Sequence, residues 1–218
     1  MTGRSKISIP DRPSLDHERR LHRAGHALVA GIDEAGRGAW AGPVVAAAVI
    51  VDSVQADRLA GVNDSKQLSA RQRDTLYQII VDNCRAFGVG YGTVEEIDSI
   101  GILPATRLAM TRAVEALSPQ PEALIIDAVR LPHVALPQSV FFFADSISLS
   151  VAAASIIAKV TRDRLMIDLD AQYPRYGFAR HKGYGTAIHQ DALQSIGPSK
   201  IHRQSFKPIS LLLADRLI

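Results

Sequence analysis

The sequence predicts an α/β fold in which a mixed β-sheet is flanked by helices. Two apolar segments of strand length follow one another near the N-terminus, and strand-like and helix-like segments alternate after them. From about residue 173 the chain instead mixes aromatic, basic and glycine residues. Strands that precede such an alternation are typical of a mixed sheet with helical layers, and a C-terminal helical segment is expected to cover one side.

The predicted strands are short apolar runs. The first two are rich in β-branched residues, the third alternates in polarity, and the last two each carry an aspartate at or near the end. They span residues 27–33, 43–51, 86–94, 122–129 and 139–145.

The predicted helices span residues 14–24, 69–84, 104–117 and 146–172. Ser14 and Ser69 are residues that cap helix N-termini, and Gly25 is suited to end the first helix. Pro104 is favoured in the first turn of the third helix. The last helix contains the small residues 152–155 (AAAS), which let a helix lie close against a sheet.

The composition indicates a single cytoplasmic domain. The chain has 218 residues, 47% of them hydrophobic, which is enough to bury one sizeable core. We expect residues 1–13 to form a flexible tail and residues 14–218 to form the domain. No apolar run approaches the roughly 18 residues of a membrane span, and the start lacks the apolar stretch of a signal peptide. Cys84 is the only cysteine, which excludes a disulfide framework and a cysteine-ligated zinc site.

Carboxylates at strand ends are the first functional signal. Asp33, Asp127 and Asp145 each end or nearly end an apolar run, and Glu34 adjoins the first. If these strands are neighbours, the repulsion between the carboxylates requires divalent cations. Oxygen-only ligands suit Mg²⁺ or Mn²⁺, and two such ions can support an in-line attack on a phosphodiester. Asp145 alone could simply cap the next helix.

Asp33 and Glu34 are adjacent, and adjacent side chains on a regular strand face opposite ways. For both to serve one site, the strand has to break there, which Ala35 and Gly36 would permit. The glycines that follow, in GRGAWAG (36–42), do not fit a dinucleotide-binding fingerprint, because Pro43 and a further strand replace the required helix. They indicate either a tight hairpin or a close backbone approach to a ligand, with Arg37 available for phosphate.

Five motifs, in order, resemble the ribonuclease HII family, the type 2 ribonucleases H. They are DEAGRG with AGPVVAAAVI, NDSKQLS (63–69), EEIDSIGILPAT (95–106), AAASIIAKVTRD (152–163) and YGFARHKGYGT with HRQSF (176–206). The resemblance runs from about residue 14 to residue 209. It implies a ribonuclease H-like fold with a five-stranded mixed sheet and a helical C-terminal extension, whose residues from about 173 to 218 would bind substrate.

The resemblance also implies the site residues. Asp33, Glu34, Asp127 and Asp145 match the catalytic, metal-binding carboxylates. Residues 36–38 (Gly36, Arg37 and Gly38) match a loop that contacts the ribonucleotide through its backbone, and Tyr184 matches a tyrosine that recognises the junction with the following deoxyribose. Further substrate contacts are expected from the phosphate-binding candidates Ser65, Lys66, Lys182 and Arg203. The formal charge of +3 permits such a polyanionic partner without requiring it.

The implied activity is Mg²⁺- or Mn²⁺-dependent cleavage of the RNA strand of RNA/DNA hybrids, including cleavage 5′ to single ribonucleotides embedded in duplex DNA. The products would carry 3′-hydroxyl and 5′-phosphate ends, and the enzyme would be a monomer that contacts no membrane. Ala128, Phe143 and Ala144 depart from the family pattern beside catalytic positions. Two alternatives remain: a nuclease of the HIII type, which prefers long hybrids, and an inactive hybrid-binding protein, which only Ala128 and Ala144 suggest.

Several other polar residues receive structural interpretations. Asp163, with Lys159 one turn before it, is expected on an exposed helix face. The histidines of the C-terminal segment lack plausible zinc spacing, and we expect surface or structural roles for them; these are His181, His189 and His202.

Overall fold

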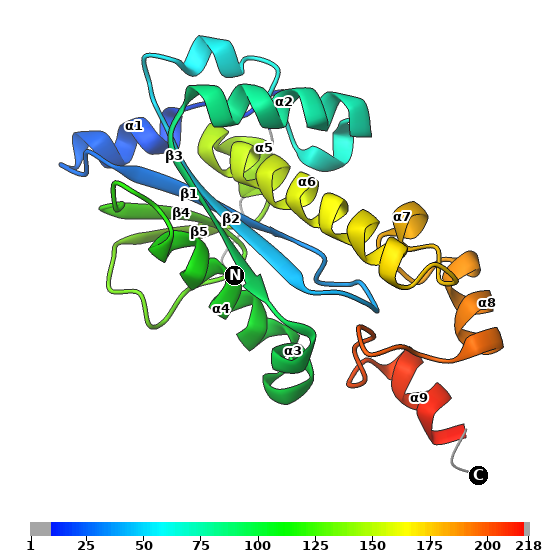
Figure 1. Cartoon of the computed structure of the whole chain (residues 1–218). Coiled ribbons are helices and arrows are strands. Elements are labelled where there is room, and N and C mark those ends of the chain that lie inside the picture. The colour runs from blue at the N-terminus through cyan, green and yellow to red at the C-terminus, as the bar shows by residue number, and fades with distance from the viewer. Residues whose placement is uncertain (1–9, 216–218) are drawn as a thin grey trace, which may run out of the picture.

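The computed structural model describes residues 10–215, and it contains a five-stranded mixed sheet with helices on both faces (Figure 1). The strands are β1 (Val29–Ala35), β2 (Val44–Val51), β3 (Cys84–Gly92), β4 (Ala123–Asp127) and β5 (Gln138–Phe141). Their order is β3-β2-β1-β4-β5; β1 and β3 are antiparallel to β2, while β4 is parallel to both β1 and β5. The predicted sheet is confirmed. Residues 1–9 of the predicted tail lie outside the described residues.

The helices largely follow the prediction. They are α1 (Asp16–Arg23), α2 (Ala70–Asn83), α3 (Val94–Ile100), α4 (Ile102–Glu115), α5 (Ala144–Ile147), α6 (Leu149–Gln172), α7 (Phe178–His181), α8 (Ala187–Ile196) and α9 (Lys207–Asp215), with 3₁₀ turns η1 (Ala56–Leu59) and η2 (Ser65–Gln67). Ser69 caps α2 in a reciprocal capping box with Gln72, as its position predicts. Helix α3 was not predicted; Thr93 and Glu96 form its capping box.

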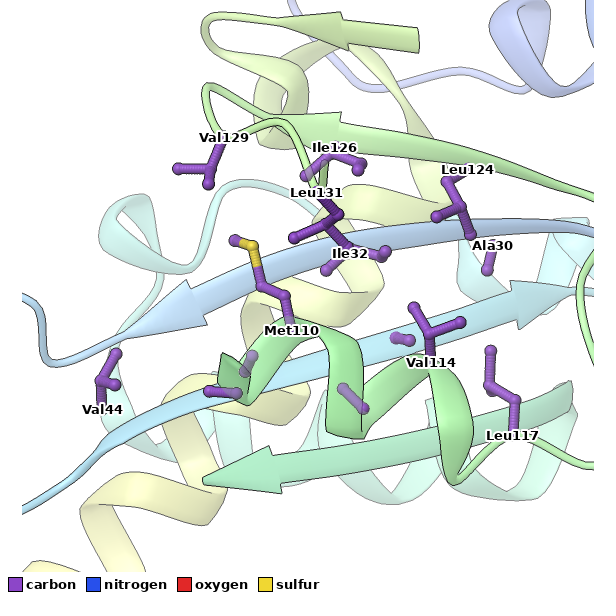
Figure 2. Packing of buried hydrophobic residues seen from close by; sticks show 14 of the residues in the cluster. Ala30, Ile32, Val44, Met110, Val114, Leu117, Leu124, Ile126, Val129 and Leu131 are labelled. Carbon is purple, nitrogen blue, oxygen red and sulfur yellow. The ribbon is translucent and has the colours of Figure 1, made fainter. Parts of the chain in front are cut away.

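The two faces of the sheet bury different helices. Helix α4 packs against the face that carries Ile32, where Met110 is fully buried (Figure 2). Helix α6 crosses the opposite face of the sheet, and helix α2 packs on the same side, against α6 (Figure 1). A Cβ atom at Gly31 of β1 would lie 2.2 Å from the backbone of Ser150, so only glycine allows α6 to approach this strand so closely. The small residues predicted for this helix therefore meet the sheet as expected.

Two predicted boundaries around Asp145 are wrong. The strand ends at Phe141, and Phe142 and Phe143 turn out of the sheet with 64% and 55% of their surfaces exposed. The prediction included them in the strand because they are apolar. Phe143 has a left-handed φ of 61°, which a strand does not contain. The helix predicted over 146–172 is divided at Ser148, which caps α6, so Asp145 lies in the separate helix α5.

The C-terminal helices α7, α8 and α9 form the expected extension beyond the end of α6 (Figure 1). They share an apolar cluster with Met166 of α6, built around Phe178 and Leu193. Within residues 10–215, no helix combines the length and the apolar character that crossing a membrane requires.

Candidate active site

Two of the predicted carboxylates are brought together by the sheet. Strands β1 and β4 are parallel, with Ile32 opposite Ile126. The next residue on each strand is Asp33 and Asp127, at the same end of neighbouring strands. Asp127 accepts a 2.9 Å hydrogen bond from the Ala144 backbone N–H, which places the first turn of α5, with Asp145, beside it.

Glu34 reaches the same cleft by a different route from the one predicted. Strand β1 continues through Ala35, so the expected break between Asp33 and Glu34 is absent. Pairing with β4 nevertheless ends at Ile32, and beyond it Asp33 and Glu34 both line one cleft. Arg37 donates to Glu34 Oε1 at 3.1 Å, while the buried Oε2 has no hydrogen-bond partner.

The carboxylates interact strongly through space. Burial, followed by the charges of Glu34 and Asp127, raises the pKa of Asp33 well above its ordinary value. Burial also raises the pKa values of Glu34 and Asp127. The negative charges are thus held together at a cost, as in sites that are completed by a cation.

Lys66 is a second cation beside this cluster, along with Arg37. Its Nζ lies 3.2 Å from Asp145 Oδ2, and its charge lowers the pKa values of Glu34 and Asp127 against the effect of burial. As the side chains stand, no three histidine, cysteine, aspartate or glutamate residues among residues 10–215 surround a common point as metal ligands. The donor set still fits a hard divalent ion: it contains only oxygens, its members repel one another, and one buried Glu34 oxygen is unpartnered.

The glycine segment connects β1 to β2 as a hairpin and also lines the cleft. Gly36 adopts a φ of 92°, and a Cβ atom there would lie 1.9 Å from Arg162 Nε. Gly36, Arg37 and Gly38 all border the carboxylate cleft. The segment is therefore a hairpin connection, and its first three residues border the cleft; contact with a ligand stays a prediction.

The predicted phosphate contact of Arg203 is contradicted by the structure. The side chain is fully buried and donates to the carbonyl oxygens of Gly42, Arg37 and Gly36 at 2.9, 2.9 and 2.8 Å. Because the side chain is fully buried, its guanidinium is not accessible to an external phosphate in this arrangement. A basic residue in a glycine-containing segment suggests a surface contact, but Arg203 instead binds the backbone of residues 36–42 on the side away from solvent.

Tyr184 is where the prediction needs it, whereas Lys182 is not. The tyrosine borders the cleft with 36% of its surface exposed, and Arg162 Cζ lies 5.5 Å from its ring centroid. Lys182 adopts a left-handed φ of 54° and its ammonium bonds to the Ala179 carbonyl. It borders a neighbouring hollow beside Asp163 instead of the carboxylate cleft.

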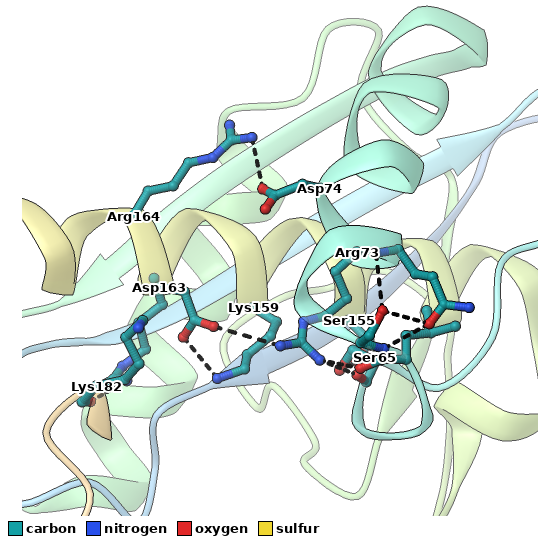
Figure 3. Close-up of polar contacts among 12 residues, drawn as sticks. Ser65, Arg73, Asp74, Ser155, Lys159, Asp163, Arg164 and Lys182 are labelled. Atoms are coloured by element: carbon teal, nitrogen blue, oxygen red, sulfur yellow. Dashed lines mark hydrogen bonds and ion pairs between the residues drawn. The ribbon is translucent and has the colours of Figure 1, made fainter. Parts of the chain in front are cut away.

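The cleft has a volume of about 380 Å³ and contains residues that the sequence analysis missed. Arg73, Ser155 and Lys159 line it along with the predicted residues. Lys159 bonds to Asp163 at 2.7 Å and Arg73 lies 3.9 Å from the same carboxylate (Figure 3). Ser155, Lys159 and Asp163 recur every four residues, so their shared helix face was visible in the sequence. Ser65 is buried and shares a 2.8 Å hydrogen bond with Ser155.

The C-terminal histidines form a buried cluster, which confirms the structural role. His189 Nδ1 bonds to the Tyr184 carbonyl at 3.0 Å, and its Nε2 meets His202 Nε2 at 2.9 Å. His181 stacks on His189 at a centroid separation of 4.4 Å. Burial lowers the pKa values of His189 and His202 to about 4, so the cluster is neutral at physiological pH. It fixes the backbone that presents Tyr184.

Ala128, which follows Asp127, occupies a conformation that glycine adopts more easily. Its φ is 55°, a value that disfavours residues with a Cβ atom. We expect Ala128→Gly to stabilise the fold by about 0.5–1 kcal/mol, after allowing for the greater freedom of glycine in the unfolded chain. Urea unfolding checks this result. Ala171→Gly, at an exposed position of α6, should instead destabilise by up to about 1 kcal/mol. Loss of stability in both variants would show that the backbone at residue 128 is not strained.

Comparison with known proteins gives a consistent result. The family model described as ribonuclease HII matches residues 30–209. The curated ribonuclease HII of Chloroflexus aurantiacus is 57% identical over 200 residues, which cover 90% of this chain and 94% of that protein. The ribonuclease HII of Chloroflexus aggregans is 52% identical over 204 residues, which cover 92% of this chain and 96% of that protein. The solved ribonuclease H2 of Pyrococcus horikoshii superimposes with a TM-score of 0.72 at 28% identity, covering 86% of this chain and 98% of that one.

Proposed function

We propose, from the premise that this chain belongs to the ribonuclease HII family, that it cleaves the phosphodiester bond 5′ to single ribonucleotides embedded in duplex DNA. The chain is an endoribonuclease of the ribonuclease H type, which acts on RNA/DNA hybrids. The proposal adds the embedded substrate, a two-metal reaction, and products with 3′-hydroxyl and 5′-phosphate ends.

One observation carries the proposal: carboxylates, glycine loop and tyrosine border the same cleft. Asp33, Glu34 and Asp127 line it together with residues 36–38 and Tyr184. A site that cuts beside one ribonucleotide needs both a centre for phosphodiester hydrolysis and groups that detect a 2′-hydroxyl. The residues proposed for both requirements border one cleft of about 380 Å³, which supports the proposal.

Asp33, Glu34, Asp127 and Asp145 would hold Mg²⁺ or Mn²⁺. Bound there, the ions would activate the attacking water and stabilise the leaving oxygen. Lys66, whose side chain is 78% exposed, can exchange Asp145 for a substrate phosphate when a cation takes over the carboxylate. Arg37, which is 43% exposed, can likewise leave Glu34 for a phosphate.

Recognition of the ribose would use backbone and ring. Residues 36–38 present peptide groups without an intervening side chain at either glycine, so they can approach the 2′-hydroxyl closely. Tyr184 would press on the following sugar, where a second 2′-hydroxyl would crowd the ring. The site would therefore require a ribose followed by a deoxyribose.

A cleavage assay tests the proposal directly. The substrate is a DNA duplex with one internal ribonucleotide, incubated with and without Mg²⁺, and the product ends are identified. Metal-dependent cleavage 5′ to the ribonucleotide is the expected result. Cleavage of long hybrids alone would favour an HIII-type nuclease, and binding without cleavage would indicate an inactive hybrid-binding protein.

Binding to the duplex should weaken steeply with salt. Arg37, Lys66 and Lys159 supply positive charge along the cleft, while Arg203 no longer counts among the phosphate contacts. If roughly four phosphates are neutralised, log K should fall with log salt at a slope of about −3 to −4. Lys66→Met should reduce the slope by about 0.9, whereas a slope near zero in the wild type would show that this charge does not dock the duplex.

The cytoplasmic location, the monomeric state and the division into a tail and one catalytic domain stay predictions. So do the assignments of Ser65, which is buried at the edge of the cleft, and Lys182, which borders the neighbouring hollow, as substrate contacts.

A further inference from the structure

Two arginines are buried without a carboxylate partner. Arg162 and Arg203 are fully buried and are the two largest such side chains. Within residues 10–215, all the hydrogen bonds of their guanidinium groups go to backbone carbonyl oxygens. Asp163 and Asp98 favour the charged forms of Arg162 and Arg203 from a distance, but neither forms an ion pair with them. Burying a charge without an ion-pair partner is costly, and well-packed apolar residues can often replace buried ions without loss of stability. The guanidinium groups therefore point to a role beyond filling space.

Both arginines act on the segment that borders the cleft. Arg203 binds the carbonyls of Gly36, Arg37 and Gly42 at 2.8–2.9 Å. Arg162 binds three further carbonyls at 2.9–3.0 Å, those of Ala41, Pro43 and Lys182. Residues 36–43 are thus held from behind by both arginines, and Arg162 also ties them to the segment that carries Tyr184.

These contacts fix the direction of the peptide groups in residues 36–38. In a trans peptide, the C=O of one residue and the N–H of the next point in opposite directions. Because Arg203 holds the carbonyls of Gly36 and Arg37, the N–H groups of Arg37 and Gly38 point away from it. Neither N–H donates to an acceptor within residues 10–215. Consecutive open N–H groups of this kind bind anions and oxygen atoms.

The arginines add charge and a link to the tyrosine. Burial and the neighbouring Arg162 lower the pKa of Arg203 to about 9, so the group remains charged at neutral pH. The Arg162 guanidinium lies 5.5 Å from the centroid of the Tyr184 ring. Arg162 therefore lies against the Tyr184 ring and also packs directly behind Gly36, where a Cβ atom would lie 1.9 Å from its Nε.

We propose that Arg162 and Arg203 are positioning residues that set the discrimination between ribose and deoxyribose, by orienting the Arg37 and Gly38 N–H groups and the Tyr184 ring relative to each other. This inference rests on the proposed function. Neither arginine touches the substrate; both act through the backbone that does.

The test compares Arg203→Lys and Arg162→Lys with the wild type. Lysine keeps the charge but cannot bind two or three carbonyls in a fixed fork. The measurement is the affinity for two DNA duplexes that differ by one 2′-hydroxyl, with Ca²⁺ in place of Mg²⁺. We expect the preference for the ribonucleotide duplex to fall about tenfold, as for one lost hydrogen bond, while affinity for the all-DNA duplex changes less than about twofold. Arg112→Lys, which disturbs bonds to Glu96 and the Tyr91 carbonyl far from the cleft, is the control and should leave the preference unchanged.

Chemical rescue adds a readout that a purely structural role would not give. In Arg203→Ala, methylguanidinium should restore the preference and methylammonium should not, because only the guanidinium can bridge several carbonyls. An unchanged preference in the folded lysine variants would overturn the inference alone, and so would failure of all the variants to fold. A wild type with no preference would overturn the proposed function together with it.

Discussion

Asp33→Asn is expected to abolish Mg²⁺-dependent cleavage while leaving the fold intact. The carboxylate is buried at the sheet end beside Asp127, and asparagine preserves its shape but removes the charge that would hold a cation. Loss of the bound cation should remove several kcal/mol of transition-state stabilisation and bring kcat close to background. A loss of about 4 kcal/mol corresponds to a rate that is roughly a thousandfold lower. The measurement is single-turnover cleavage of a duplex with one embedded ribonucleotide. Asp82→Asn, at an exposed position of α2, should retain full activity.

The same variant should be more stable than the wild type when metal is removed. Burial and neighbouring charges raise the pKa of Asp33, so its ionised form opposes folding. The protonated Asp33 therefore contributes its full share of stability at pH values below the pKa of the unfolded chain. That share is lost as pH rises through the raised pKa of the folded protein. The gain in Tm of Asp33→Asn in EDTA should therefore appear at neutral pH and disappear in acid. Near-normal activity in this variant would end the two-metal proposal, whatever its stability.

Tyr184→Ala is expected to lose activity selectively on a single embedded ribonucleotide. Removing the ring and its hydroxyl should cost on the order of 1–3 kcal/mol there, which is roughly ten- to a hundredfold in kcat/KM. On a long RNA/DNA hybrid the loss should be smaller, because no deoxyribose follows each ribose. The decisive quantity is the ratio of kcat/KM on the two substrates, in the variant against the wild type.

Tyr184→Phe separates the ring from its hydroxyl. If the ring excludes a second 2′-hydroxyl, the phenylalanine variant should keep most of the selectivity that alanine loses. The Tyr184 backbone is fixed by His189, so neither substitution should move the loop. An equal loss on both substrates would mean that the tyrosine supports general binding and that the junction is read elsewhere.

The residues that the sequence could predict are those whose local context is informative. Asp33 and Asp127 end apolar strands, and a charge at such a position is unusual enough to suggest a site. Asp145 was identified from a similar pattern, but its position was wrong, because Phe143 turns the backbone left-handed without being a glycine. Local patterns predict which residues matter more reliably than they predict where a turn begins.

The contacts that could not be predicted join segments that are distant in the sequence. Arg203 lies in a basic stretch that resembles a surface, and only the carbonyls of residues 36–42 explain its burial. Lys66 was expected to meet DNA, and its contact with Asp145 spans 79 positions of the chain. No periodicity within either segment encodes these pairings. The Arg203 contacts follow from the packing of the hairpin against the C-terminal extension, and the Lys66 contact joins the 3₁₀ turn η2 to helix α5.

The contact between residues 36–43 and residues 201–203 also has a consequence for biosynthesis. The Trp40 carbonyl accepts from the Arg203 N–H at 2.8 Å, and the Ile201 carbonyl accepts from the Gly42 N–H at 2.8 Å. A ribosome adds about 5–20 residues per second, so the hairpin waits roughly 8 to 30 s for these partners to be made. Until then its glycine loop lacks the carbonyl anchors that fix it. A polypeptide released before Arg203 is made would carry every carboxylate of the cleft, but its residues 36–43 would lack these anchors.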